Sequence, residues 1–415
     1  MLESHPSKFA VAALSIAAAG VALHVLAAIR LRQHFRRGRE AASPDTPPLT
    51  LWGALKRGVP DLDGKLEALV RGSRASDQIL LGADTGSAEL ATCAALRARH
   101  RDRVITVVAC ERDRAANPKI SKYIQMSPHA LHAHWLLTDS EAMPGTDFIE
   151  SFRREWRASG ADTMTAGYRF ANLRTFPQAL DASPALLTLW PGLMLAGKVG
   201  FTLGACTAVK AGDITALGGW ETFGSDLAED HRLGATLAKM GRTIRLSRSV
   251  LTLDSDPMRW GDYFLHQHRV AVTYRAATPA GALGLPVLHT LGFAIAATVL
   301  HAPFWKWTAL IALARIAIAA AFSRILGFSI RLLPPMDTWA SPPSAWTAAR
   351  AVAQAAGIVL ASCASIVGID RSLSLDISTR SAVVMASPAA SCFLKAARRF
   401  ASAFDTEPSA RPTAA

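Results

Sequence analysis

The stretch QILLGA at residues 78–83, which ends at Asp84, and the stretch VITVVA at residues 104–109 decide the fold of this chain. Each is an apolar run with the length of a buried strand. Between them, residues 87–100 show a helical pattern in which Ser87 is a typical N-cap. Strands that alternate with helices in this way predict an α/β domain, with a mostly parallel sheet and helices on both faces.

Two acidic residues directly follow predicted strands. Asp84 ends the first strand, and Asp139 follows a strand predicted at residues 134–138 (HWLLT). Open α/β sheets bind their ligands at the carboxyl ends of the strands, so we expect both carboxylates at one site. Two further strands are predicted at residues 162–168 and 201–209.

A second group of acids lies at the start of a helix predicted at residues 226–240, which carries Glu229 and Asp230 in its first turns. Acids are favoured there by the helix dipole, so one interpretation is purely structural. The other is chemical, because a carboxylate such as Asp230 can serve as a general base. Asp139 and Glu141 add two hard oxygen ligands of the kind that Mg²⁺ or Mn²⁺ uses on a diphosphate.

The N-terminal region predicts a membrane anchor. Residues 9–29 form an apolar stretch long enough to cross a bilayer, which takes about 20 residues. Five arginines follow it: Arg30, Arg32, Arg36, Arg37 and Arg39. A cleaved signal peptide is the alternative, but there the strong charge would precede the apolar run. The positive-inside rule places the N-terminus outside and the chain after Arg30 in the cytosol.

The C-terminal third predicts a transmembrane hairpin, with spans at residues 281–301 and 305–325. Arg315 falls inside the second span, either buried against neighbouring helices or marking a different helix register. Residues 323–333 suit an interfacial amphipathic helix. Residues 346–369 form a weaker apolar stretch that either spans or lies in the interface.

Composition supports this division. Charged residues make up 19% of the chain, below the roughly 25% of soluble domains. The net charge of +13 gathers beside apolar stretches, which favours an anionic membrane surface over nucleic acid. The five scattered cysteines indicate reduced thiols. The predicted regions are an anchor (1–45), a cytosolic catalytic domain (46–278), a membrane hairpin with an interfacial helix and a possible further span (279–370), and a low-complexity tail that is partly disordered (371–415).

Several short motifs together resemble the ceramide-glucosyltransferase-like proteins of glycosyltransferase family 2, and within them the hopanoid-biosynthesis glycosyltransferases. The first block is NPKIS at residues 117–121, followed by MSPHA at residues 126–130 and LTDS at residues 137–140. The second is GGW at residues 218–220, followed by LAEDHRLG at residues 227–234. The resemblance covers residues 47–275 and implies a GT-A nucleotide-diphospho-sugar transferase domain attached to transmembrane helices.

The resemblance also implies roles for individual residues. Asp84 matches the family aspartate near the uridine, and Asn117 and Lys119 match an element beside the sugar donor. Asp139 matches the aspartate of the metal site, which would hold Mg²⁺ or Mn²⁺. Asp230, next to Glu229 in the LAED motif, matches the catalytic base of an inverting enzyme.

The last family motif, (Q/R)xxRW, is altered in this chain. Arg269 matches, but His266 replaces Gln or Arg and Val270 replaces Trp, so contacts to the acceptor or the diphosphate are expected to differ. The opening strand, at residues 49–56, also departs from the family pattern. Three nearby aromatic residues suit either a lipid-facing surface or the core of a helix packing: Trp260, Tyr263 and Phe264.

The expected function is that of a multi-pass protein of a bacterial inner membrane with a cytosolic catalytic domain. It would move a hexose or N-acetylhexosamine from a UDP-sugar to a lipid hydroxyl, with Asp230, Glu229 and Arg269 as catalytic residues. A hopanoid polyol with UDP-N-acetylglucosamine and a ceramide with UDP-glucose remain alternatives. A different class of function is an inactive relative that binds UDP or acts as a membrane scaffold.

Overall fold

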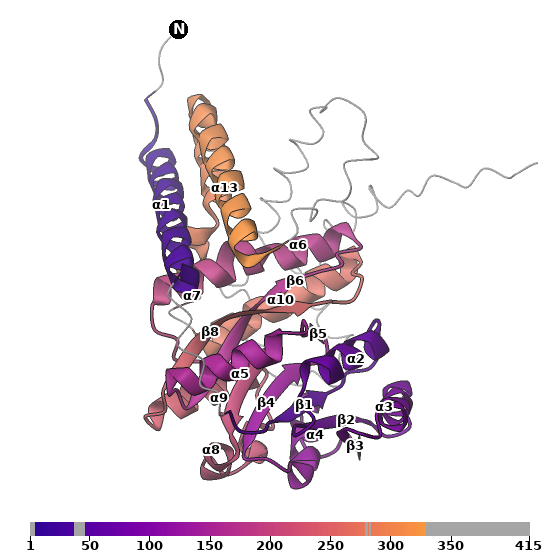
Figure 1. Cartoon of the computed structure of the whole chain (residues 1–415). Coiled ribbons are helices and arrows are strands. Elements are labelled where there is room, and N and C mark those ends of the chain that lie inside the picture. Colours follow the sequence, from indigo (N-terminus) through magenta and orange to yellow (C-terminus); the bar gives the residue numbers. More distant parts are fainter. Residues whose placement is uncertain (1–4, 37–45, 279–280, 282–283, 329–415) are drawn as a thin grey trace, which may run out of the picture.

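The computed structural model describes residues 5–36, 46–278, 281 and 284–328 (Figure 1). At its centre lies an eight-stranded sheet with strand order β3-β2-β1-β4-β7-β6-β8-β5. The strands are β1 (Thr50–Ala54), β2 (Gln78–Asp84), β3 (Val104–Cys110), β4 (His134–Asp139), β5 (Ala142–Met143), β6 (Thr163–Phe170), β7 (Cys206–Lys210) and β8 (Ile244–Leu253). Four of the seven pairings between neighbours are parallel, and the other three are antiparallel.

The first half of the sheet, β1 to β4, is parallel, as the alternation of strands and helices predicts. Every residue of β1 and β2 is buried, which matches their continuous apolar sequences. The altered segment at residues 49–56 therefore still supplies a central strand. The predicted helix forms as α3 (Ala88–Arg99), and Ser87 caps it by accepting a hydrogen bond from the Leu90 amide at 3.3 Å.

The second half is mixed, because β7 runs antiparallel to both β4 and β6. The strand predicted at residues 201–209 is shorter than expected and begins at Cys206. Its first part is held by side chains instead of a strand partner. The Leu203 amide donates to Thr165 Oγ1 at 2.9 Å, and Thr202 Oγ1 donates to the Asp230 carbonyl at 2.6 Å. This loop reaches the carboxyl end of β4.

Helices cover both faces of the sheet, as expected. One apolar core joins the sheet to α2 (Leu62–Gly72), α3 and α5 (Phe148–Ser159). A second core on the other face joins it to α4 (Pro118–Met126), α8 (Ala211–Ala216) and α9 (Glu229–Lys239). Short 3₁₀ turns, η1 (Ser127–His129) and η3 (Trp220–Phe223), complete this domain.

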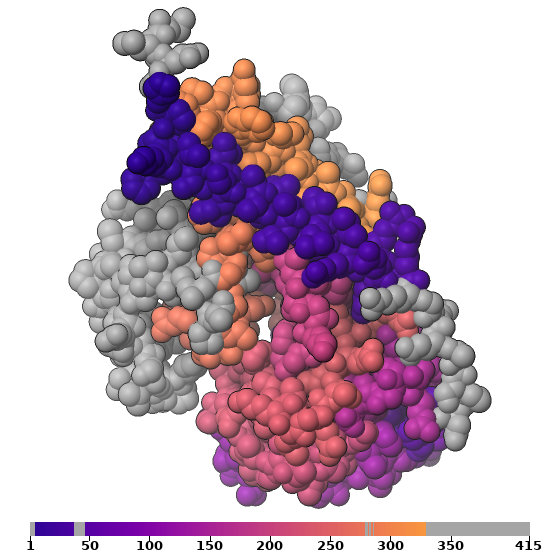
Figure 2. All heavy atoms as spheres, turned by 90° about the vertical axis from the view of Figure 1, so that its left-hand side faces the viewer, coloured from indigo at the N-terminus to yellow at the C-terminus, as the bar shows by residue number. Residues whose placement is uncertain are grey.

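Among the residues that the structure describes, three helical segments are long and apolar enough to cross a membrane: α1 (Lys8–Arg36), residues 176–196, and residues 302–326. The first and last match predicted spans. α1 packs along α13 (Trp305–Leu326), as the indigo and orange rods of Figures 1 and 2 show. The hairpin turn between spans is η5 (Ala302–Phe304).

The segment at residues 176–196 is missed by the sequence prediction. It consists of α6 (Phe176–Pro184), a π-helical turn η2 (Ala185–Leu189) and α7 (Trp190–Ala196), and we call it the cross-helix. It lies across the base of α1 and α13 instead of beside them (Figure 1). Its apolar residues share a core with both helices and with β6 and β8. The cross-helix therefore joins α1 and α13 to the domain that contains the sheet.

Polar side chains of α1 and α13 secure this junction. His24 Nε2 bonds the Leu187 carbonyl in the π-helical turn at 2.9 Å. Arg30 donates to the Met194 and Leu195 carbonyls at 3.2 and 3.1 Å, where cations stabilise the end of a helix. Arg315 donates to the Leu288 carbonyl at 2.8 Å, so it is held within the helix bundle.

The predicted hairpin differs from the structure in its first arm. α12 (Thr290–Leu300) has 11 residues and spans about 16 Å, shorter than the predicted 21-residue span. A 3₁₀ turn, η4 (Leu285–Leu288), precedes it where Pro286 interrupts the apolar run. The start of the predicted interfacial helix belongs to α13, which ends at the left-handed Gly327. The rest of that helix and residues 346–369 lie outside the described residues.

Candidate active site

Three acidic residues predicted from two separate motifs meet at the carboxyl end of the sheet, and a fourth ends another strand. Asp139 ends β4, and Glu229 and Asp230 begin α9. Gly204 marks how closely they approach: a Cβ atom built there would lie 2.9 Å from Asp230 Oδ2 and 3.7 Å from Asp139 Oδ2. Any larger residue would press on these carboxylates. The fourth acid, Asp84, ends β2 and has its own set of partners.

Lys119 is the cation at the centre of this cluster. Its Nζ atom lies 2.7 Å from Asp139 Oδ1 and 3.2 Å from Glu229 Oε1. Burial lowers the pKa of Lys119, but the negative charges, led by Asp139, outweigh it and raise this pKa well above its usual range. Lys119 is therefore charged at any physiological pH, and it partly neutralises the acids around it.

Asn117 places Lys119 by capping α4. Its Oδ1 atom accepts hydrogen bonds from the amides of Lys119 and Ile120, at 2.9 and 3.4 Å. Its Nδ2 atom donates to Glu229 Oε2 at 3.1 Å and to the Asp226 carbonyl at 2.8 Å. Asn117 therefore joins the start of α4 to the start of α9.

Asp230 has the environment of a general base. Burial and the neighbouring charge of Glu229 raise its pKa, and Lys119 and the His231 amide lower it in part, so that the pKa lies at about 6. A carboxylate with a raised pKa is still ionised near neutral pH, and it holds a proton better than an ordinary aspartate does. This is the property that removal of a hydroxyl proton requires.

Asp84 is surrounded by three cations. Lys122 Nζ lies 2.7 Å from Oδ1, while Arg57 and Arg112 both donate to Oδ2, the first at 3.0 Å. Burial raises the pKa of Asp84, but its bonds to Arg112 and Lys122 outweigh burial and lower the pKa to about 2. Both arginines are 59% exposed, so this strand end presents positive charge to solvent. None of the three cations is predicted from the sequence, because their motifs are far apart in the chain.

Glu141, the second predicted metal ligand, has different partners from Asp139. Its carboxylate pairs with Lys56, which also donates to Asp256 at 2.8 Å. Among the described residues, no group of three or more acidic, histidine or cysteine side chains could hold a metal ion. Asp139 has the right chemistry for Mg²⁺ or Mn²⁺, since these ions often take one or two protein carboxylates and complete their shell with phosphate oxygens and water.

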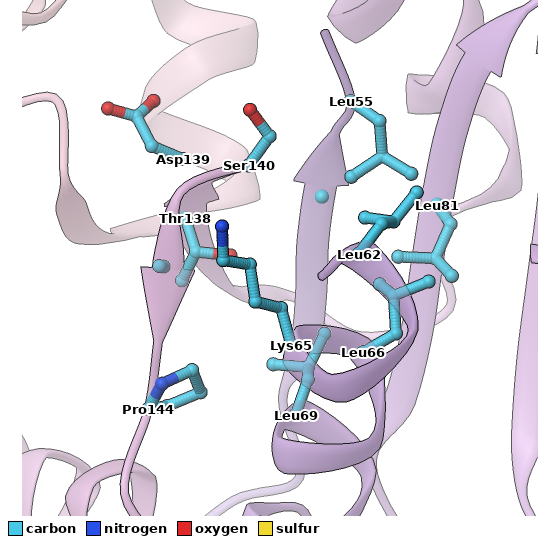
Figure 3. A pocket seen from close by; sticks show the side chains of 12 residues that line it. Leu55, Leu62, Lys65, Leu66, Leu69, Leu81, Thr138, Asp139, Ser140 and Pro144 are labelled. Atoms are coloured by element: carbon cyan, nitrogen blue, oxygen red, sulfur yellow. The ribbon is translucent and has the colours of Figure 1, made fainter. Parts of the chain in front are cut away.

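A small pocket opens beside Asp139 and Ser140, between β4 and α2 (Figure 3). Lys65 extends from α2 toward Thr138 in this pocket, and its Nζ donates to the Asp254 carbonyl at 2.8 Å. Burial lowers the pKa of Lys65, and the charge of Asp254 opposes this effect. The other lining residues are largely leucines, so the pocket is mostly apolar beside the end of β4.

The altered motif lies on α10 (Trp260–Ala277). His266 Nδ1 is 2.6 Å from Asp181 Oδ1 of α6, and Gln267 Nε2 donates to the same oxygen at 2.7 Å. Arg269 is exposed, and no acidic side chain in the described ranges pairs with its guanidinium. Asp181 is absent from the sequence prediction, and a lone acid inside the apolar run FPQALDASPALL was its only signal.

The charge of the acid cluster acts on Tyr274 of α10. Burial, followed by the charge of Asp230, raises the pKa of its phenol. The predicted site residues therefore fall into four places, three of which are the cluster of Asn117, Lys119, Asp139, Glu229 and Asp230, Asp84 among its cations, and Arg269 on α10. Glu141 lies apart from Asp139, within the Lys56 ion pairs.

Solved structures of other proteins are similar to this fold. A mannosyltransferase from Pyrobaculum calidifontis, solved with GDP-mannose and Mn²⁺, aligns with a TM-score of 0.50 and 18% identity, over 87% of this chain and 99% of that one. TarS from S. aureus, residues 1–349 with UDP-GlcNAc, aligns with a TM-score of 0.36 and 11% identity, over 68% and 91%. No curated protein matches the sequence.

The chain has the fold of a GT-A glycosyltransferase, with apolar helices attached. The chain belongs to glycosyl transferase family 21, whose model matches residues 8–348. The expected family number, 2, is thus replaced by 21, and the ceramide-glucosyltransferase-like assignment holds. Because the match begins in α1 and extends past α13, the membrane helices are part of the family's pattern.

Proposed function

We propose that this enzyme transfers a sugar from a UDP-sugar to the hydroxyl of a membrane lipid, with inversion at the anomeric carbon. The observation that carries the proposal is Asp230, a partly buried carboxylate with a raised pKa, beside Lys119 and Asp139. The cross-helix supports a lipid acceptor, because it joins this domain to two apolar helices of membrane-spanning length.

The reaction is a single displacement. The acceptor hydroxyl oxygen attacks the anomeric carbon, and its proton passes to Asp230. The bond from that carbon to the donor's diphosphate oxygen breaks, and the electron pair leaves with UDP. Lys119 contributes positive charge beside the departing group, and Arg57 and Arg112 present positive charge at the nucleotide end. A divalent ion held by Asp139 would neutralise further charge on the diphosphate when bound.

The lipid is proposed at the level of two candidates, a ceramide-like acceptor with UDP-glucose and a hopanoid polyol with UDP-N-acetylglucosamine. We further propose that the catalytic domain faces the cytosol of a bacterial inner membrane, since arginines follow α1. The proposed catalytic residues are Asp230, Glu229 and Arg269, with Asp84, Asn117, Lys119 and Asp139 on the donor side and Asp139 as metal ligand.

The test uses the full chain in membranes supplied with each radiolabelled UDP-sugar and each lipid. Extraction and mass spectrometry should find one labelled glycolipid in wild-type membranes and none with Asp230→Asn. Calorimetry with UDP and Mn²⁺ should show binding in both proteins. Binding without any glycolipid from the wild type would contradict the proposal and support the non-catalytic alternative.

A further inference from the structure

The contact between α6 and α10 contains a partly buried hydrogen-bonded pair that the proposed chemistry does not use. Asp181 of α6 has a side chain only 10% exposed, and its Oδ1 atom lies 2.6 Å from His266 Nδ1. Gln267 donates to the same oxygen. A carboxylate accepts but does not donate when ionised, so Nδ1 of His266 carries the shared proton.

This pairing fixes the imidazole of His266. With Nδ1 protonated, Nε2 of the neutral ring is a hydrogen-bond acceptor, and the Asp181 contact sets the orientation of the ring. Within the described ranges, Nε2 has no partner, and the side chain is 31% exposed. A fixed ring with a free acceptor atom is suited to bind a hydroxyl.

The pair lies on the same face of α10 as a residue near the base. Tyr263, His266, Val270 and Tyr274 follow helical spacing along one face, and His266 and Tyr274 are about 12 Å apart along the axis. Tyr274 senses the charge of Asp230.

The pKa of Tyr168 of β6 depends on charged or titratable groups at both ends of this face. Burial raises the pKa of its phenol, as do Tyr274, Asp230, Asp139 and Asp181. The charges of Asp230 and of Asp181 therefore both act on this one phenol.

The surroundings of the pair suit a lipid. Trp260 packs against Phe176 of α6 with ring centroids 5.9 Å apart, and it stacks on Phe264 at 6.2 Å. Tyr263 packs against both Trp260 and Phe264. Asp181 itself belongs to the cross-helix, which lies at the base of α1 and α13 (Figure 1). The polar pair thus joins two helices, α6 and α10, that also contact each other through aromatic rings.

We propose that His266 hydrogen-bonds a head-group hydroxyl of the lipid acceptor, and that Asp181 is a positioning residue that holds its imidazole for this contact. The proposal rests on the proposed function for the identity of the acceptor. It assigns to this chain a polar acceptor contact, formed by two helices, at the position where the (Q/R)xxRW motif is altered.

The kinetic test measures transfer by the full chain in nanodiscs, with the donor and lipid that the assay above identifies. His266→Ala and Asp181→Asn should each raise the acceptor KM about tenfold, the equivalent of one hydrogen bond, and leave the donor KM and kcat within about threefold. The double variant should match His266→Ala alone, because Asp181 acts through His266. His266→Gln should recover part of the loss, since an amide also accepts a hydrogen bond.

Gln267→Ala is the matched control. It removes a bond of similar length to the same Asp181 oxygen without touching His266. Its acceptor KM should stay near the wild-type value. If Gln267→Ala raises this KM as much as His266→Ala does, or if Asp181→Asn raises both substrates' KM equally, the pair only holds α6 against α10 and the proposal fails.

A binding test separates this inference from the proposed function. Protein labelled with ¹⁵N-histidine is titrated with a short-chain ceramide and a hopanoid polyol, each compared with its O-methylated form. The His266 Nε2 signal, identified by its loss in His266→Ala, should shift with a hydroxyl lipid and not with its methylated form. No shift with either hydroxyl lipid overturns the inference. A shift in a wild-type protein that makes no glycolipid overturns only the proposed function.

Discussion

The carboxyl end of the sheet and the α6–α10 contact are built differently. At the sheet end, Asp139, Lys119 and Asp230 come from separate elements and hold one another through short ion pairs and close packing around Gly204. On α10, Arg269 is exposed, and within the described part of the chain the side-chain hydrogen bonds of the altered motif, from His266 and Gln267, are made with Asp181.

The difference suggests a division of labour. Residues that share charge cannot change one at a time without leaving a buried charge uncompensated, which is costly. Residues on a helix face that meets the substrate can change singly, at the cost of one contact. We therefore expect the donor chemistry to behave as a coupled unit and the acceptor side to behave as separable contacts.

The largest expected effect is that of Asp230→Asn. Loss of the base should lower kcat roughly 1,000-fold, within the range for general base catalysis. The donor KM should stay within a few-fold, because the amide keeps the shape of the carboxylate. Radiolabelled transfer kinetics measure both. A kcat within tenfold of the wild-type value would show that Asp230 is not the general base. The contrast between the two regions would then fail.

The next effect concerns stability. Asp84→Asn leaves Lys122, with a side chain 6% exposed, without its ion pair, and this should cost about 3 kcal/mol of unfolding free energy. Arg112→Ala is the control, because its guanidinium is 59% exposed and such pairs contribute about 1 kcal/mol or less. Thermal unfolding in detergent should show a clearly lower Tm for the first variant only. Equal shifts would mean that the cations around Asp84 do not form a buried unit.

Lys119→Met tests the coupling within the cluster. It should lower kcat about 100-fold, the usual cost of removing one electrostatic contact to the transition state. The positive charge of Lys119 lowers the pKa of Asp230, so its loss should raise that pKa above about 6. Because the base acts when ionised, the acidic limb of the kcat profile should move to higher pH. A limb that stays in place would show that Lys119 and Asp230 are uncoupled.

The smallest effect distinguishes two predicted metal ligands. Asp139→Asn should weaken Mn²⁺ activation at least about tenfold, the loss typical of changes at a metal site. Glu141→Gln should change it less than about threefold, because Glu141 pairs with Lys56. Mn²⁺ titration of transferase activity measures both. Similar losses in the two variants would restore the sequence prediction that both residues hold the ion.

The sequence predicts the parallel half of the sheet well, because strands buried on both faces have continuous apolar runs such as QILLGA. The acid cluster follows from the motifs, since the ends of β4 and α9 meet wherever this fold forms. The loop at residues 201–205 is harder to predict. Its apolar residues resemble a strand, yet Thr165 and Asp230 bind its polar groups.

The membrane-facing part is the least predictable. Residues 176–196 contain Asp181, Pro184 and Pro191, and their mean hydropathy of 1.2 is well below the 2.2 of α1. In the sequence, such a run resembles a helix of a soluble domain more than a membrane span, and only its neighbours in the structure show otherwise. Asp181 is recognisable as part of a site only after α10 is placed against it, because the two lie 85 residues from each other.

Arg30 and His24 hold the cross-helix to α1, and this has a consequence for how the proposed reaction would depend on substrate supply. An enzyme fixed at a bilayer meets its acceptor by lateral diffusion, so the relevant concentration is molecules per unit area of membrane. Diluting the acceptor with inert lipid would slow transfer, while diluting the whole suspension of vesicles would not. Because the cross-helix holds the domain to α1, enzyme and acceptor would meet by diffusion in the plane of the membrane and not through the surrounding solution.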